Sequence, residues 1–96
     1  MFYLPVTATV YKDGIVLFET DCEARIEYEI VDGLPDWDVT EFHFDAVGTE
    51  PGKRIYTKIT RTEPLFHILY AAADHEWLHE QVIEALINNE EISRYA

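Results

Sequence analysis

The sequence has little of what several common enzyme sites require: one cysteine, four glycines and one serine among 96 residues. The single thiol, Cys22, cannot form an internal disulfide, which favours a reducing compartment. The glycines are isolated, so they form no glycine-rich loop that could hold a phosphate. Ser93 lies in the last few residues, and no Ser/His/Asp set is indicated.

Long apolar runs are also missing. No stretch approaches the roughly 20 residues of a membrane-spanning helix, and Met1–Pro5 carry no basic residue of a secretion signal. We therefore expect a soluble cytoplasmic protein with no membrane partner. The 48% apolar and 14% aromatic content is typical of a folded protein, and the length suits one domain, residues 1–96.

Cations are scarce, with 7 Lys and Arg against 19 Asp and Glu, which gives a net charge of −12. Between Asp13 and Glu50, twelve carboxylates are accompanied by one cation, Arg25. A field with so much charge of one sign repels nucleic acid and anionic lipid. It indicates a basic protein partner or a role in solubility, and no direct binding of nucleic acid.

The first 61 residues follow the two-residue period of β-strands. Asp13-Gly14 can supply the positive φ values of a hairpin turn. Val39 is out of phase with Phe42, and a bulge near Thr40-Glu41 would restore the alternation. The expected strands are Leu4–Tyr11, Ile15–Thr20, Glu23–Ile30, Asp38–Val47 and Arg54–Thr60, the last with Ile55 and Ile59 facing inward.

Residues 62–90 follow a helical period, with Thr62 as the expected N-cap and Pro64 in the first turn. Asp74 either breaks this segment into two helices or lies on the solvent face of one. Asn88-Asn89 is the expected end. The predicted fold is α+β: an antiparallel β-sheet of four to five strands (1–61), a C-terminal helical segment on one of its faces (62–90) and a tail (91–96).

Residues 75–79, HEWLH, match the H-E-x-x-H signature of zinc metallopeptidases. The signature would make His75 and His79 zinc ligands and Glu76 the general base. However, the residues after the second histidine are charged and polar, and no third ligand is evident. Both histidines also point toward the apolar stripe of the helix, where a histidine is more often a core or rim residue. We expect no catalytic residue, metal or cofactor, and keep a small zinc-dependent hydrolase as the alternative.

Two other residues attract attention. His43 falls on the polar side of its strand and is expected to be a surface histidine, with membership of a metal site as the lesser alternative. Asp21 and Glu23 flank Cys22 and are expected to raise the pKa of its thiol, which disfavours a thiolate nucleophile.

The outward side chains of the strand Glu23–Ile30 and of the next strand predict an acidic sheet face. Its rows of carboxylates would be spaced by about 6.5–7 Å along each strand. Every second phosphate of a DNA strand has a similar spacing, at one phosphate per about 3.4 Å. Such a face could block a nucleic-acid channel lined by Lys and Arg, or it could only keep a solvated sheet soluble. The predicted partner-binding carboxylates are Glu23, Glu27, Glu29, Asp32, Asp36, Asp38, Glu41 and Asp45.

The basic residues Lys53, Arg54, Lys58 and Arg61 are expected to pair with acids of the sheet.

A second predicted surface is aromatic. If residues 64–88 form one helix, Phe66, Tyr70 and Trp77 form an exposed strip that suits a target or a second copy in a homodimer. If Asp74 breaks the helix, the first segment rotates and buries Phe66 or Tyr70.

Residues 25–33 (RIEYEIVDG), followed by Pro35, Trp37, Val39 and residues 42–45 (FHFD), resemble short acidic proteins of phages and prophages. The resemblance implies an antiparallel sheet before one helix. Some small acidic phage proteins inhibit nucleic-acid-directed host defences, and the resemblance therefore implies an inhibitor of the anti-CRISPR kind that acts as a DNA mimic. It assigns no functional residue.

The sequence thus predicts a small acidic protein-binding module, an inhibitor or regulator whose partner has a basic, nucleic-acid-binding surface. The alternatives are the zinc-dependent hydrolase and an accessory or structural phage protein without a catalytic role.

Overall fold

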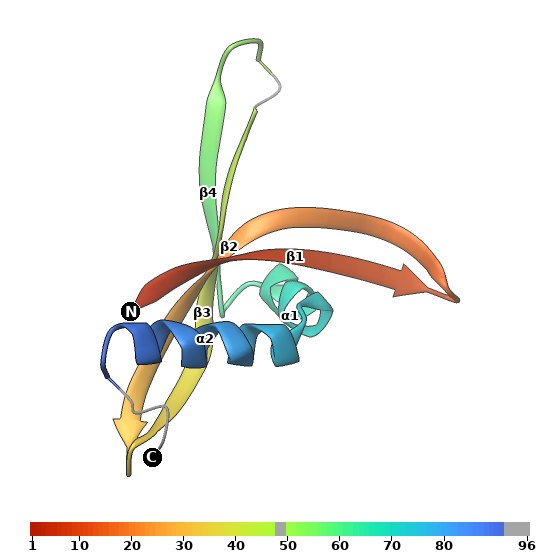
Figure 1. Cartoon of the computed structure of the whole chain (residues 1–96). Helices are drawn as coiled ribbons and strands as arrows, with labels where there is room; N and C mark the ends of the chain where they lie inside the picture. The colour runs from red at the N-terminus through yellow and green to blue at the C-terminus, as the bar shows by residue number, and fades with distance from the viewer. Residues whose placement is uncertain (48–49, 92–96) are drawn as a thin grey trace.

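The computed structural model describes residues 1–47 and 50–91. Within these residues, one sheet contains four antiparallel strands in the order β1-β2-β3-β4. Two helices follow and lie against one face of the sheet (Figure 1). The predicted α+β fold is confirmed. The elements are β1 (Phe2–Lys12), β2 (Ile15–Val31), β3 (Leu34–Val47), β4 (Arg54–Thr60), α1 (Pro64–Ala72) and α2 (His75–Asn88).

The three hairpins of the sheet diverge from the region above the helices and point in different directions (Figure 1). The radius of gyration over the Cα atoms is 15.6 Å, whereas a compact domain of this length has about 12–13 Å. The ends of the hairpins therefore extend beyond the helices, and their side chains are left exposed.

β2 is one strand of 17 residues, where the sequence predicted two. The two runs are continuous because the first part of β2 pairs with β1 while the second part also pairs with β3. The turn at Asp13-Gly14 follows the prediction, and Asp32-Gly33 at the other end of β2 forms a turn of the same kind. Asp13 and Gly14 have φ values of 52° and 80°, and Asp32 and Gly33 have 52° and 78°, the positive values that a tight hairpin turn needs.

The predicted bulge in β3 is present at Thr40. Arg25 pairs with Glu41 and Ile26 pairs with Val39, so Thr40 is the additional residue. The bulge places Val39 and Phe42 on the same side of the sheet, and both are fully buried. Without it, one half of β3 would turn its apolar side chains to solvent.

The core lies between the inner face of the sheet and the two helices. Ile59 of β4 is buried as predicted, but Ile55 is 53% exposed, and its predicted inward position is wrong. The β3–β4 hairpin extends past α1, so nothing among the described residues covers Ile55. The buried apolar residues are Val6, Ala8, Cys22, Ala24, Ile26, Val39, Phe42, Ile59, Phe66, Leu69, Ala73, Leu78, Val82 and Leu86.

The helical segment is broken at Asp74, so the single continuous helix is the wrong alternative. The Asp74 side chain accepts a hydrogen bond from the backbone N–H of Trp77 at 3.0 Å and caps α2. α1 begins differently from the prediction: its N-cap is Glu63, without a side-chain cap, and Thr62 lies before it. The Thr62 hydroxyl contacts that of Thr60 instead, at 3.1 Å. α2 ends at Asn88, with Asn89 as its C-cap, as predicted.

No helix within residues 1–47 and 50–91 combines the length and the apolar character that crossing a bilayer requires.

Candidate functional site

The face of the sheet opposite the helices carries the predicted carboxylates. Along β2, the exposed Glu27 and Glu29 alternate with inner residues such as the buried Ile26. Antiparallel pairing places Glu27 directly opposite Asp38 and Glu29 directly opposite Asp36. Directly opposed residues have Cβ atoms about 4.5–5.5 Å apart, so Glu29 and Asp36 bring two negative charges together. The Asp38 carboxylate is instead bonded by Arg61 and by Tyr70 of α1.

The remaining predicted carboxylates lie further along β2 and β3 or in the turn between them. Asp32 is in the turn that joins β2 to β3, Glu23 is opposite His43, and Glu41 is opposite Arg25. We use the name carboxylate face for the outer side of the β2–β3 hairpin, made up of Glu27, Glu29, Asp32, Asp36 and Asp38.

Cations of β4 and its end neutralise one side of this surface, as the sequence predicted. Arg61 forms an ion pair with Asp38 at 2.8 Å, and Arg54 forms one with Asp45 at 3.1 Å. Lys58 lies 3.7 Å from Glu41, and Arg25 lies 3.8 Å from the same carboxylate. Lys53 differs from the prediction, because its partner at 2.8 Å is Glu50, which lies between β3 and β4 and not in the sheet.

The other side of the surface stays negative. Glu27 shares Arg25 with Glu41, at 3.3 Å. Glu23, Glu29, Asp32 and Asp36 are exposed, and within the described ranges none of them has an ion-pair partner. Of these four carboxylates, all but Glu23 therefore lie toward the Asp32 turn, away from β4. A shallow recess of about 380 Å³ is bordered by Glu27, Glu29, Asp36 and Asp38, together with Tyr28, Trp37, Thr40 and Arg61.

His43 is buried, with 8% of its surface exposed, so its predicted exposed position is wrong. One ring nitrogen, Nε2, lies 2.9 Å from the Glu41 carboxylate, and Nδ1 is hydrogen-bonded to the Tyr56 hydroxyl. The ring of Tyr3 meets the imidazole edge-on at 5.0 Å. Residues from β1 and β4 thus cover His43, and the sequence around it contains no signal for that. The hydrogen bond from His43 lowers the pKa of Glu41, and Lys58 and Arg25 act in the same direction.

The H-E-x-x-H motif lies in the first turns of α2. The Nε2 atom of His75 donates a hydrogen bond to the backbone carbonyl of Tyr70 at 2.6 Å, and His79 accepts one at Nδ1 from the Trp37 indole at 2.9 Å. Glu76 is exposed. In the part of the chain that the structure describes, no three His, Cys, Asp or Glu side chains are grouped so that they could hold a metal ion. Zinc binding through both Nε2 atoms would require His75 to release the Tyr70 carbonyl.

The predicted aromatic strip does not form, because the break at Asp74 separates its members. Phe66 is buried, and its ring packs at a tilt against that of Phe42, with the centroids 5.2 Å apart. Tyr70 is half-buried and donates to Asp38 at 3.0 Å. Trp77 is 38% exposed and lines a recess of about 480 Å³ between α2 and β1. The single exposed helix face on which the predicted homodimer depended is therefore absent.

Cys22 is buried, and its thiol has a pKa raised to about 11. Burial is the larger cause and Asp21 the smaller, whereas the sequence pointed only to neighbouring acids. The direction of the predicted shift is confirmed.

Comparisons with protein-family models, curated proteins and solved structures found no match for this chain.

Proposed function

We propose that this protein is a binding module, an inhibitor or regulator that presents the carboxylate face to a basic, nucleic-acid-binding surface of another protein in the cytoplasm. The observation that carries the proposal is the register that places Glu29 directly opposite Asp36, two exposed carboxylates that have no ion-pair partner within the described ranges. Like charges directly opposite each other destabilise a sheet. Cations of a partner would turn this unfavourable arrangement into a favourable one on binding.

The geometry of the face supports a partner that normally binds phosphates. Side chains on one side of a strand repeat every about 6.5–7 Å, close to the distance between every second phosphate of a DNA strand. The face is also open on the Asp32 side, because the ion pairs with Arg54, Lys58 and Arg61 lie toward β4. The phage-like sequence pattern around residues 25–45 supports an inhibitor within this class.

The test is affinity capture of host proteins by the purified chain, with release by DNA. Wild-type protein should retain a DNA-binding protein that elutes when duplex DNA is added and when salt is raised. The double variant Glu29→Gln/Asp36→Asn should retain at least tenfold less of it.

A matched control removes the same charge elsewhere. Glu76→Gln/Glu80→Gln changes two exposed carboxylates of α2 and should bind like wild type. Equal loss in both double variants would show that net charge alone governs retention. Capture that resists both DNA and salt would contradict a DNA-mimicking role.

A further inference from the structure

The edge of β1 that faces away from β2 has no strand beside it. β1 is the first strand in the sheet order, and within the described residues it pairs only with β2. An edge of this kind leaves about half of the backbone N–H and C=O groups of the strand open to another chain. Pro5 has no N–H, which suits an edge strand but limits pairing to the residues that follow it. Val6–Val10 is therefore a stretch of edge that can accept a further strand.

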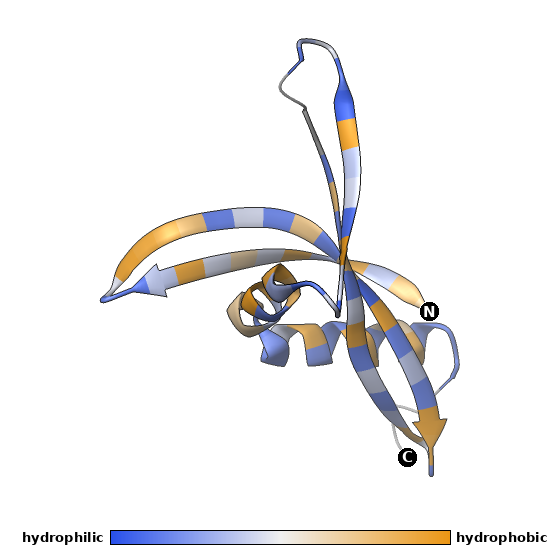
Figure 2. Cartoon of the chain, turned by 180° about the vertical axis from the view of Figure 1, so that it is seen from behind, coloured by the Kyte–Doolittle hydropathy of each residue, from blue (hydrophilic) through white to orange (hydrophobic). Residues whose placement is uncertain are grey.

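Two recesses follow this edge, one beside each helix. Both helices contact β1, and Figure 2 shows α1 close to it, with most of the helix coloured as hydrophobic. The recess beside α2 measures about 480 Å³ and includes residues 5–7, and the recess beside α1 measures about 560 Å³ and includes residues 9–11. Alternate residues of a strand point to opposite faces. A recess that contains three consecutive residues of β1 therefore borders the edge of the strand as well as one face.

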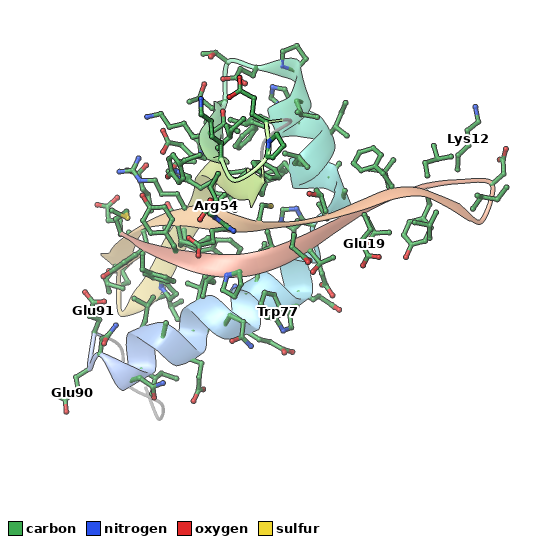
Figure 3. All side chains as sticks on the ribbon, turned by 90° about the horizontal axis from the view of Figure 1, so that it is seen from above. Lys12, Glu19, Arg54, Trp77, Glu90 and Glu91 are labelled. Carbon is green, nitrogen blue, oxygen red and sulfur yellow. The ribbon has the colours of Figure 1, made fainter. Side chains whose placement is uncertain are left out.

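The recess beside α2 has the chemistry of a site for a cationic side chain. It is bordered by Asp74 and Trp77 of α2 and by Asp21 of β2, and Figure 3 shows Trp77 between the start of α2 and β1. The Thr7 hydroxyl donates a hydrogen bond to Asp21 at 2.7 Å and holds this carboxylate beside β1. In the described part of the chain, neither carboxylate has an ion-pair partner. Two carboxylates and an indole ring together attract Lys or Arg.

The recess beside α1 has a different character. Its helix side consists of His67, Ile68, Ala71 and Ala72, which share one side of α1. Ile68 is 48% exposed there. The residues that line this recess include no Asp, Glu, Lys or Arg. It therefore suits a large apolar side chain.

The strand register relates the two recesses to each other. Val6 and Val10 lie on the same face of β1, four residues apart; the first borders the recess beside α2 and the second the recess beside α1. The pairing of β1 with β2 is regular between them, because the register shift occurs after Val10. A strand added to this edge would direct the residue opposite Val6 and the residue opposite Val10 toward the helices, about 13–14 Å apart.

We propose that an extended segment of a partner protein pairs with Val6–Val10, with a Lys or Arg side chain in the recess beside α2 and a large apolar side chain, four residues away, in the recess beside α1. In such strand addition, backbone pairing supplies affinity, and the recesses for alternate side chains supply specificity. The carboxylate face lies on the side of the sheet without helices, so the inference does not depend on the proposed function.

A second copy of this chain fits the two recesses less well. The edge strands of the described sheet are β1 and β4. Within β1, the residue four positions from Lys12 is the small Ala8. In β4, the residues four positions from Arg54 and Lys58 are all charged or polar. Neither strand offers a cation and a large apolar side chain at the required spacing.

Fluorescence polarisation with three labelled peptides of the same composition tests the spacing. STKVTVLTS and STLVTVKTS carry Lys and Leu four residues apart, in the two chain directions. STKVTLVTS carries them three residues apart, on opposite faces of an extended strand. One of the first two peptides should bind at least tenfold more tightly than the third. Equal binding of all three, or no binding up to 1 mM, would overturn the proposal. If the chain also sediments at twice its mass of 11.2 kDa, a second copy covers the edge instead.

Variants of the two recesses test where the peptide lies. Asp74→Asn, which can still cap α2, should weaken binding about tenfold, whereas Glu76→Gln makes the same charge change outside the recess and should not. Ile68→Asn should also weaken binding, and Leu65→Asn is its control, because Leu65 is 43% exposed on α1 outside the recess. Binding should slow amide hydrogen exchange in β1, as backbone pairing requires. Unchanged exchange in β1, or equal loss of binding in variant and control, would overturn the proposal.

Discussion

His43 shows how a single residue can organise a face that the sequence describes only as polar. It is the one buried polar side chain among the described residues, although it belongs to the side of the sheet without helices. Tyr3 and Tyr56 cover it, and Glu41 holds its Nε2 atom. A buried polar group is tolerated when its hydrogen bonds are made, and both ring nitrogens here have a partner.

We expect Glu41→Gln to lower the free energy of unfolding by about 1 kcal/mol at pH 7, because the charge-assisted contact with His43 is lost while the site stays partly open to water. The hydrogen bond from His43 lowers the pKa of Glu41. Its contribution is therefore present above the ordinary carboxyl pKa and disappears as pH falls through the lowered value. Urea unfolding at pH 7 and in acid should show the difference from wild type narrowing with acid. A difference that grows in acid would contradict this role.

At the scale of elements, Asp74 determines where the helical segment divides. Its backbone is extended, with φ −81° and ψ 98°, and its carboxylate caps the N-terminus of α2. A carboxylate at this position also interacts favourably with the helix dipole. The break rotates α1 so that Phe66 and Leu69 face the core.

We expect Asp74→Ala to lower the free energy of unfolding by about 0.5–2 kcal/mol, the usual cost of losing an N-cap. Asp74→Asn should retain most of the stability, because the amide oxygen can still accept from the Trp77 N–H. Thermal or urea unfolding followed by circular dichroism measures both variants. If the alanine variant were as stable as wild type, the capping contact at 3.0 Å would have no energetic role.

The elements also show which features the sequence could predict. Local patterns were sufficient for the Asp13-Gly14 turn and for the bulge at Thr40, because turn chemistry and strand alternation involve only neighbouring residues. The exposure of Ile55 and the burial of His43 depend on how far the helices reach and on which strands lie next to each other. The sequence of one strand contains no information on either. The prediction of Thr62 as the N-cap of α1 is wrong. The Thr62 hydroxyl bonds the Thr60 hydroxyl instead of capping the helix, and the capping pattern does not reveal this competing contact.

The candidate site likewise has features that the sequence could predict and features that it could not. The alternation along β2 predicted which carboxylates face outward, and the basic residues of β4 were expected to pair with them. Which acids they neutralise follows from the strand register, which places Asp45 and Glu41 beside β4 and leaves Glu29 and Asp36 far from it. In the described structure, β2 pairs with β3 only from Glu23 onward. The sequence could not predict this, because it depends on where β3 diverges from β2.

At the scale of the whole molecule, the three diverging hairpins carry three exposed surfaces of different chemical character. The net charge of −12 is spread unevenly: the β3–β4 side is paired, the β2–β3 turn is negative and the β1–β2 end is apolar. Uncompensated charge opposes folding, so the carboxylate face lowers the stability of the isolated chain.

A double-mutant cycle on Glu29 and Asp36 measures that loss of stability. Each of Glu29→Gln and Asp36→Asn should stabilise the free protein by about 0.2–1 kcal/mol, because each removes one half of a like-charge pair. The double variant should gain less than the two single variants together, since either substitution already ends the repulsion. The coupling should vanish in 1 M salt, where the Debye length falls to about 3 Å. Additive gains at low salt would mean that the two carboxylates do not interact. Suppose that the stability effects of Glu29→Gln and Asp36→Asn are coupled and that the double variant also fails to retain the DNA-binding protein. The two carboxylates that destabilise the free chain are then also the ones that bind the partner.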